Sequence, residues 1–146
     1  MAVKAIPDEY RTVQPYLIVD GAAKLIDFVK GAFGAEERMR MPGPDGKVMH
    51  AEVQIGDSVI MLADANAEFP PMPTTILLYM EDVDTVYERA LAAGGKSERG
   101  PEDMFYGDRS AGVRDPFGNR WWIHTHIEDV SPEEMGRRQA AMAQQS

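Results

Sequence analysis

The spacing of apolar residues changes repeatedly along the chain, and each change marks a new element of secondary structure. Residues 12–20 are rich in β-branched and aromatic side chains and predict a strand. Apolar residues three and four positions apart then predict a helix, which we expect Asp20 to cap and Gly34 to end. Another strand follows, and a two-residue turn at Gly56 and Asp57 then joins two strands into a hairpin.

The same order of elements then begins again. Residues 74–81 predict a strand, Asp82 is placed to cap a second helix, and two further strands flank a turn at residues 116–118. An offset of 61 residues carries the apolar positions of the first helix onto those of the second, and Gly34 onto Gly95. We therefore predict an internal duplication of a βαβββ unit, with modules at about residues 12–65 and 74–128.

The C-terminal segment predicts one more helix. Ser131 and Glu134 form a capping box, and Pro132 occupies the first helical position. We expect this helix to cover about residues 131–144 and to pack on the domain or on a partner. Since 146 residues are the size of one ordinary domain, we predict a single α+β domain spanning residues 1–146.

Composition excludes several classes of function. The chain has 24 acidic and 15 basic residues, and its net charge of −9 opposes binding to nucleic acid or to an anionic membrane. No apolar run approaches the roughly 20 residues that span a bilayer, and the first residues lack the apolar region of a secretory signal. Without cysteine there is no disulfide and no thiolate metal site. We expect a cytoplasmic protein.

The two βαβββ units, the helix end GAFGAEE, the hairpin HAEVQIGDSVIML and the terminal turn DPFGN together resemble the vicinal-oxygen-chelate superfamily. That superfamily contains glyoxalase I, extradiol dioxygenases, fosfomycin-resistance enzymes and bleomycin-binding proteins, and the sequence is most similar to its PhnB-like branch. The resemblance covers about residues 12–130. It implies the glyoxalase/bleomycin-resistance fold, in which two modules form a curved mixed sheet around a cleft, commonly in a homodimer.

The resemblance also implies where a metal would bind, because metal-dependent members carry ligands at four strand positions that face the cleft. In this sequence the four positions are Gln14, Met61, Thr75 and Trp122. Only the carbonyl oxygen of Gln14 suits a hard divalent cation. The other three positions hold poor ligands for it: a thioether, a neutral hydroxyl and an indole. Catalytic metal centres usually need three protein ligands. We therefore expect no metal site and no cofactor.

The side chains that line the cleft follow from strand register. The Gly56-Asp57 turn pairs Glu52 with Met61, and paired residues share one face of a sheet. Alternation along the other strands extends this set. The expected ligand-binding residues are Gln14, Tyr16, His50, Glu52, Met61, Thr75, Leu77, Tyr79, Trp122 and His124. Arg109 is a further candidate, either as a contact for a carboxylate or phosphate or as a surface ion pair with Asp103 or Asp108.

Three functions remain open at this stage. The first is a metal-free protein that binds or sequesters an unidentified small organic molecule. The second is a glyoxalase-like lyase or isomerase, or a dioxygenase-type enzyme, using His50 and Glu52 without metal or a displaced metal site at His124, His126 and Glu128. The third is a structural or regulatory partner with a vestigial cleft. The lost ligands and the aromatic lining favour binding.

Overall fold

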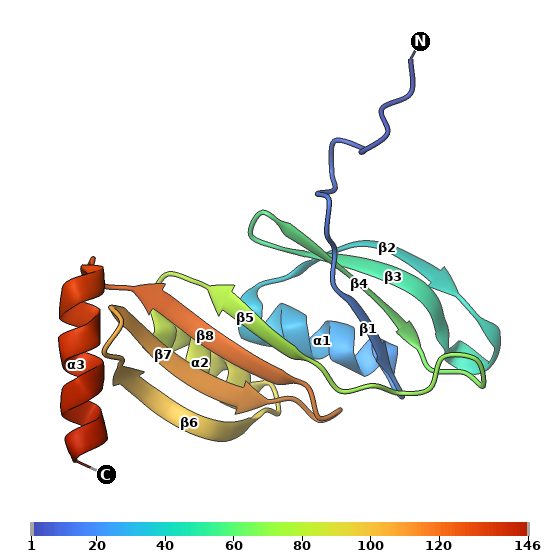
Figure 1. Ribbon diagram of the computed structural model, residues 1–146. Coiled ribbons are helices and arrows are strands. Elements are labelled where there is room, and N and C mark those ends of the chain that lie inside the picture. The colour runs from blue at the N-terminus through green and yellow to red at the C-terminus, as the bar shows by residue number, and fades with distance from the viewer. Residues whose placement is uncertain (1, 146) are drawn as a thin grey trace.

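Each half of the chain folds into a four-stranded mixed sheet backed by one helix (Figure 1). The computed structural model describes residues 2–145, so only Met1 and Ser146 of the predicted domain lie outside the described residues. The first module contains β1 (Tyr16–Val19), α1 (Ala22–Phe33), β2 (Glu36–Pro42), a short 3-10 helix (Pro44–Gly46), β3 (Val48–Ile55) and β4 (Ser58–Asp64). The second contains β5 (Thr75–Tyr79), α2 (Val83–Ala92), β6 (Lys96–Asp103), β7 (Asp108–Arg114) and β8 (Arg120–His126), and α3 (Pro132–Gln144) follows it.

Both sheets have the same topology. Their strand orders are β1-β4-β3-β2 and β5-β8-β7-β6, with the first two strands of each parallel and the remaining pairs antiparallel. In the first hairpin Glu52 pairs with Met61 and Ile55 with Ser58. The predicted duplication and the predicted hairpin register are therefore both confirmed.

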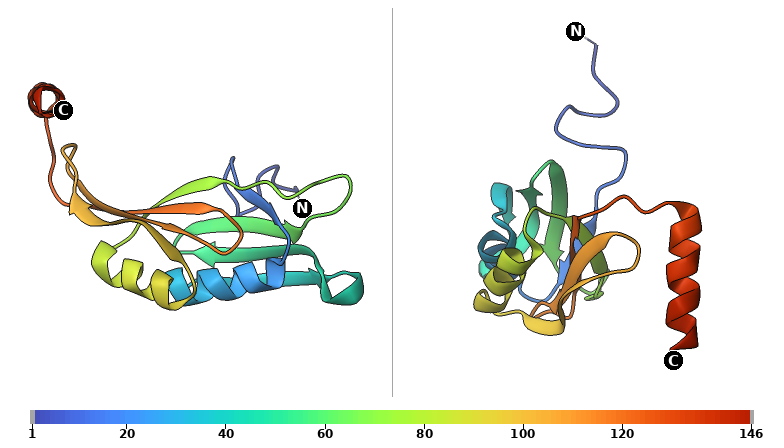
Figure 2. Two further views of the ribbon diagram at one scale, coloured as in Figure 1. Left: turned by 90° about the horizontal axis from the view of Figure 1, so that it is seen from below. Right: turned by 90° about the vertical axis from the view of Figure 1, so that its left-hand side faces the viewer.

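Helices α1 and α2 lie beside each other on the same side of the two sheets (Figure 2). The residues they bury form one continuous core with the helix-facing side chains of both sheets. The ring centroid of Phe33, at the end of α1, lies 5.0 Å from that of Trp121 in β8, so the core passes from one module into the other.

The opposite side of each sheet, called the open face below, is not covered by α1 or α2. Along β1 and β5 the burial alternates, because Leu17 and Val19 belong to the core whereas Tyr16, Leu77 and Tyr79 are 48–64% exposed. The predicted division of side chains between the two faces is therefore confirmed on these strands. When large aromatic and aliphatic side chains in contact with solvent form a contiguous patch, they are typical of a binding surface.

One helix cap differs from the prediction. Asp20 does not cap α1; the N-cap residue is Gly21, and the Asp64 carboxylate accepts hydrogen bonds from the amides of Gly21 and Ala22 at 2.8 and 3.0 Å. The same carboxylate accepts from the amide of Val48 at 2.7 Å. A residue from the end of β4 therefore replaces a local cap, which no local pattern indicates.

The other predicted helix ends are confirmed. Gly34 ends α1 in the left-handed conformation, Asp82 caps α2 through the amide of Thr85, and Ser131 caps α3 through the amide of Glu134. The first strand is shorter than predicted and begins at Tyr16, so Gln14 precedes it.

The C-terminal helix α3 stands apart from the body of the molecule, on the side of the open faces (Figure 2). None of its described residues is buried. Arg138 connects it to the body by donating to the carbonyl oxygen of Phe105 at 3.0 Å and to the Glu128 carboxylate at 2.6 Å. Among the described residues no helix is long and apolar enough to cross a membrane.

Candidate functional site

Four side chains on the first module form a hydrogen-bonded chain, which we call the Glu52 network. The buried Glu52 carboxylate accepts from the hydroxyl of Tyr10 at 2.5 Å and lies 2.9 Å from Nε2 of His50. Nδ1 of His50 lies 2.8 Å from the hydroxyl of Tyr16. Because an ionised carboxylate can only accept, Nε2 of His50 is the atom that donates to Glu52.

The Glu52 network keeps its carboxylate ionised. Burial opposes the charged form of Glu52, but the hydrogen bonds from Tyr10 and His50 outweigh it and lower the pKa of this carboxyl. The hydrogen bond to Glu52 raises the pKa of Tyr10, and burial raises that of Tyr16. Both phenols are therefore neutral near pH 7, and the exposed end of the chain is a phenol rather than a phenolate.

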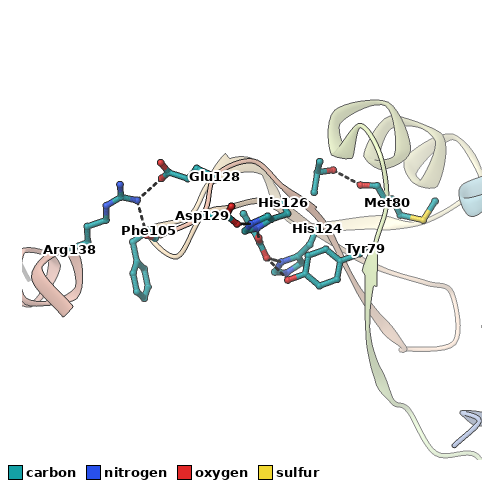
Figure 3. A network of polar contacts seen from close by, with 10 residues as sticks. Tyr79, Met80, Phe105, His124, His126, Glu128, Asp129 and Arg138 are labelled. Carbon is teal, nitrogen blue, oxygen red and sulfur yellow. Dashed lines mark hydrogen bonds and ion pairs between the residues drawn. The ribbon is translucent and has the colours of Figure 1, made fainter. Parts of the chain in front are cut away.

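A second cluster, the Asp108 network, lies on the other module and consists of Tyr79, Asp108, His124, His126 and Asp129. Figure 3 labels Tyr79, His124, His126 and Asp129. The carboxylate of Asp108 is almost fully buried. It accepts from the hydroxyl of Tyr79 at 2.7 Å, from Nδ1 of His124 at 3.0 Å and from Nδ1 of His126 at 2.8 Å. Burial alone would raise the pKa of Asp108, but these three donors lower it overall.

The two histidines of this network differ in their surroundings. His124 is 6% exposed, and the centroid of its ring lies 5.7 Å from that of Tyr79 and 6.1 Å from that of Tyr106. His126 is more exposed, and its Nε2 lies 2.7 Å from the carboxylate of Asp129. Both nitrogens of His126 face carboxylates, an arrangement that favours the doubly protonated ring. The hydrogen bond to Asp129, and next that to Asp108, raises the pKa of His126.

The displaced metal site considered from the sequence is not assembled. His124 and His126 both direct Nδ1 to Asp108, and the Glu128 carboxylate is bound by Arg138. Within residues 2–145 no group of three His, Asp or Glu side chains is arranged to hold a metal ion.

The four positions at which relatives carry metal ligands hold a donor set that does not fit a metal. The amide oxygen of Gln14 already accepts from the backbone of Arg11 at 2.6 Å. Met61 offers a thioether, and Thr75 an exposed neutral hydroxyl. Trp122 has no lone pair for a metal, and its ring packs against Gly112 of β7 with the guanidinium carbon of Arg99 5.1 Å from the ring centroid.

A cavity of about 310 Å³ adjoins the open face of the first sheet. The N-terminal segment supplies most of its walls, and Met61 supplies the sheet side. The lining residues are Ala5, Ile6, Pro7, Tyr10, Arg11, Thr12, Gln14 and Met61. Tyr10 connects this segment to Glu52, so the cavity and the Glu52 network share a wall.

The structure brings the sequence-predicted residues together in two groups and leaves Arg109 aside. Tyr16, His50, Glu52 and Met61 lie on the open face of the first sheet, and Leu77, Tyr79, Trp122 and His124 on that of the second. Arg109 instead points toward α2, where it forms a bidentate ion pair with Asp84. It forms a second ion pair with Asp103 of β6. Of the two alternatives predicted for Arg109, this geometry agrees with the surface ion pair.

Three residues with central contacts were missed by the sequence reasoning: Tyr10, Arg99 and, as the hub of a network, Asp108. Tyr10 lies outside any periodic element, and Arg99 lies in an edge strand with two register shifts. Asp108 could have been found, because a strand register that pairs it with His126 follows from the turn at residues 116–118.

Comparison with known proteins places this geometry in a family. The model of the Glyoxalase/Bleomycin resistance protein/Dioxygenase superfamily matches residues 11–123. The uncharacterized protein Mb0911c of Mycobacterium bovis is 38% identical over 159 aligned residues, covering 99% of this chain and 98% of that protein.

Solved structures agree on the fold. TioX from Micromonospora sp. ML1 superposes with a TM-score of 0.66 at 20% identity, covering 83% of this chain and 100% of that one. A PhnB protein from Bacillus cereus superposes with a TM-score of 0.61 at 19% identity, covering 79% of this chain and 99% of that one. On the match of the family model and the duplicated βαβββ topology, this chain belongs to the glyoxalase/bleomycin resistance/dioxygenase superfamily.

Proposed function

We propose that this protein binds a small organic molecule with an aromatic or apolar body on its open faces, without a resident metal ion. The observation that carries the proposal concerns Tyr16 and Tyr79. Each ring is about half or more exposed, yet its hydroxyl is bonded to a fixed group, His50 in one case and the buried Asp108 in the other. Rigid aromatic surfaces with oriented polar ends are typical of small-molecule sites.

The metal-free part of the proposal rests on donor chemistry. At the family's ligand positions only Gln14 offers an oxygen suited to a hard cation, and Arg11 already uses it. The exposed aliphatic side chain of Leu77, which pairs with Trp122, instead favours an apolar contact at this place.

We further propose that the working unit is a homodimer. The chain exposes 9131 Å², whereas a compact monomer of 16.2 kDa exposes about 7,500 Å². The excess of about 1,600 Å² exceeds the roughly 800 Å² that each partner buries in a stable interface. The open faces and α3 lie on the same side of the molecule, so a second copy placed there would cover both and enclose the ligand (Figure 2).

A proton-transfer enzyme is the second candidate, and the Glu52 network is the observation that favours it. A buried carboxylate that orients an imidazole is a common general-base arrangement. In the Glu52 network, however, both nitrogens of His50 are bonded, so the ring would have to release Tyr16 or Glu52 before it could act on a ligand. Binding therefore agrees better with the geometry.

A thermal-shift screen of small organic molecules, run once in EDTA and once with Mn²⁺ or Zn²⁺, tests the proposal. A ligand that binds only the native state raises the melting temperature. We expect aromatic compounds to stabilise the protein equally in both buffers and to lose their effect when Leu77→Asp and Tyr79→Ala are combined. Stabilisation that requires the metal would contradict the metal-free proposal. If no compound raises the melting temperature, the proposed binding function is contradicted.

A further inference from the structure

We propose that the open face of the second sheet binds a carboxylate through Arg99, so that the ligand is an organic acid with an aromatic or apolar body. This inference rests on the proposed function, because it names the class of ligand for the same face. It assigns a binding role to a residue in an irregular edge strand, outside the positions at which relatives place their metal.

Arg99 is positioned on the open face by strand register. In β6 it pairs with Gly112 of β7, and Gly112 pairs in turn with Trp122 of β8. Because Gly112 has no side chain, the indole of Trp122 lies against its backbone, and the Arg99 guanidinium sits 5.1 Å from the centre of that ring. Stacking on an indole holds a guanidinium in a fixed plane while leaving its edge available for hydrogen bonds.

Arg99 uses only part of its donor capacity. Its Nη2 donates to the hydroxyl of Ser110, whereas Nε is covered and has no hydrogen-bond acceptor within residues 2–145. The nearest acid to Nε is the half-exposed Glu102, at 3.6 Å, an ion pair that is too long for a hydrogen bond. Nη1 makes no hydrogen bond or ion pair within residues 2–145, and the side chain is 32% exposed, so Nη1 is the donor that an incoming carboxylate oxygen can reach.

The other arginines of this face are already engaged. Arg114 and Arg120 form a cross-strand pair and share the carboxylate of Glu98 at 2.6 and 3.3 Å. In the described part of this face, Arg99 is therefore the arginine whose ion pair, with Glu102 at 3.6 Å, is too long for a hydrogen bond. On a chain with a net charge of −9, such a local site makes the difference between attracting and repelling an anion.

The neighbours of Arg99 define the rest of the ligand. A carboxylate in the plane of the guanidinium places the attached body over Trp122 and toward Leu77, its cross-strand partner in β5. Leu77 is 51% exposed, and Tyr79 lies two residues further along the strand. This surface suits a flat apolar body, and the neighbouring arginines on the face are paired with Glu98, which favours a monocarboxylate.

Isothermal titration in EDTA with 2-naphthoate and with 2-naphthamide tests the inference, because the two probes differ only in carboxylate and carboxamide. We expect the wild-type protein to bind naphthoate at least tenfold more tightly than naphthamide. Arg99→Gln should weaken naphthoate binding at least tenfold and leave naphthamide binding unchanged. Arg99→Lys, which keeps the charge but loses the planar donors, should give an intermediate loss.

Arg114→Gln is the matched control, since it removes an equal charge from the same face and should change naphthoate binding less than threefold. Equal binding of the two probes, or equal losses in Arg99→Gln and Arg114→Gln, would overturn the role of Arg99 while leaving the proposed function intact. Failure of both probes to bind would also overturn it, and the thermal-shift screen then decides separately whether the open faces bind other compounds.

Discussion

Trp122 lies directly over Gly112 of the neighbouring strand. A Cβ atom built on Gly112 would come within 2.3 Å of the indole ring, far inside van der Waals contact. The glycine is therefore the reason that a large aromatic residue can lie flat at a position where metal-dependent relatives carry a ligand. The packing of Trp122 on Gly112 determines the shape of the open face at this place, and substitution of Gly112 tests it.

Gly112→Ala should displace the Trp122 ring and destabilise the protein by about 1–3 kcal/mol, as overpacking does. The matched control is Gly100→Ala in β6, where a new Cβ would meet only the Tyr87 hydroxyl at 4.0 Å. We expect the control to stay within about 0.5 kcal/mol of wild type. Urea unfolding measures both; equal effects of the two substitutions would mean that the stacking on Gly112 is not tight.

The capping of α1 by a distant residue gives a second prediction. Asp64→Ala removes the acceptor of three backbone amides and should cost about 2–4 kcal/mol of unfolding free energy. Asp20→Ala, at the position where the sequence predicts the cap, should change the free energy by less than about 0.5 kcal/mol. The reverse order of the two effects would show that the local cap operates after all.

His126 predicts how stability depends on pH above neutrality. Hydrogen bonds to Asp129 and Asp108 raise its pKa, so the stabilisation is complete below about pH 6.5 and is lost as the pH rises through the folded-state value. Melting temperatures measured between pH 6 and 9 should fall for wild type and stay flatter for His126→Gln. Asp129→Asn should lower the pKa of His126, as followed by NMR; an unchanged titration would refute the bridging geometry.

The proposed homodimer can be tested on α3. Met135, Arg138 and Met142 share one face of this helix, and Met142 is 49% exposed. We expect Met142→Glu to raise the dimer dissociation constant at least tenfold in sedimentation experiments. Gln144→Glu adds the same charge on the opposite face and should change it less than threefold. A wild-type protein that sediments as a monomer would contradict the dimer, and equal effects would exclude this face of α3.

Much of the fold could be predicted from the sequence because its signals are local. The Gly56-Asp57 turn sets the hairpin register, and with it the shared face of Glu52 and Met61. Caps at Asp82 and Ser131 act on amides three residues away, so they too can be read from the chain. Such contacts join residues that are close in sequence, so they can be predicted without knowledge of the whole fold.

The remaining features depend on contacts between distant segments. Asp64 caps a helix 42 residues earlier, Tyr10 reaches Glu52 across the same separation, and Arg109 finds its partner on α2. His124 and His126 were candidates for a displaced metal site, and both contact Asp108 instead; their spacing alone could not distinguish a shared carboxylate from a metal site. Register shifts in β6 likewise concealed that Arg99 stacks on Trp122.

The indole N–H signals of the two tryptophans test the central claim most directly, since the open face contains Trp122 and the core contains Trp121. The indole of Trp121 is fully buried and donates to Asp115 at 2.9 Å, so it serves as an internal control. During titration with 2-naphthoate in EDTA, we predict a saturable shift of the Trp122 signal and none of the Trp121 signal. A Trp122 signal that does not move at millimolar probe, or equal shifts of both signals, would contradict binding on the open face.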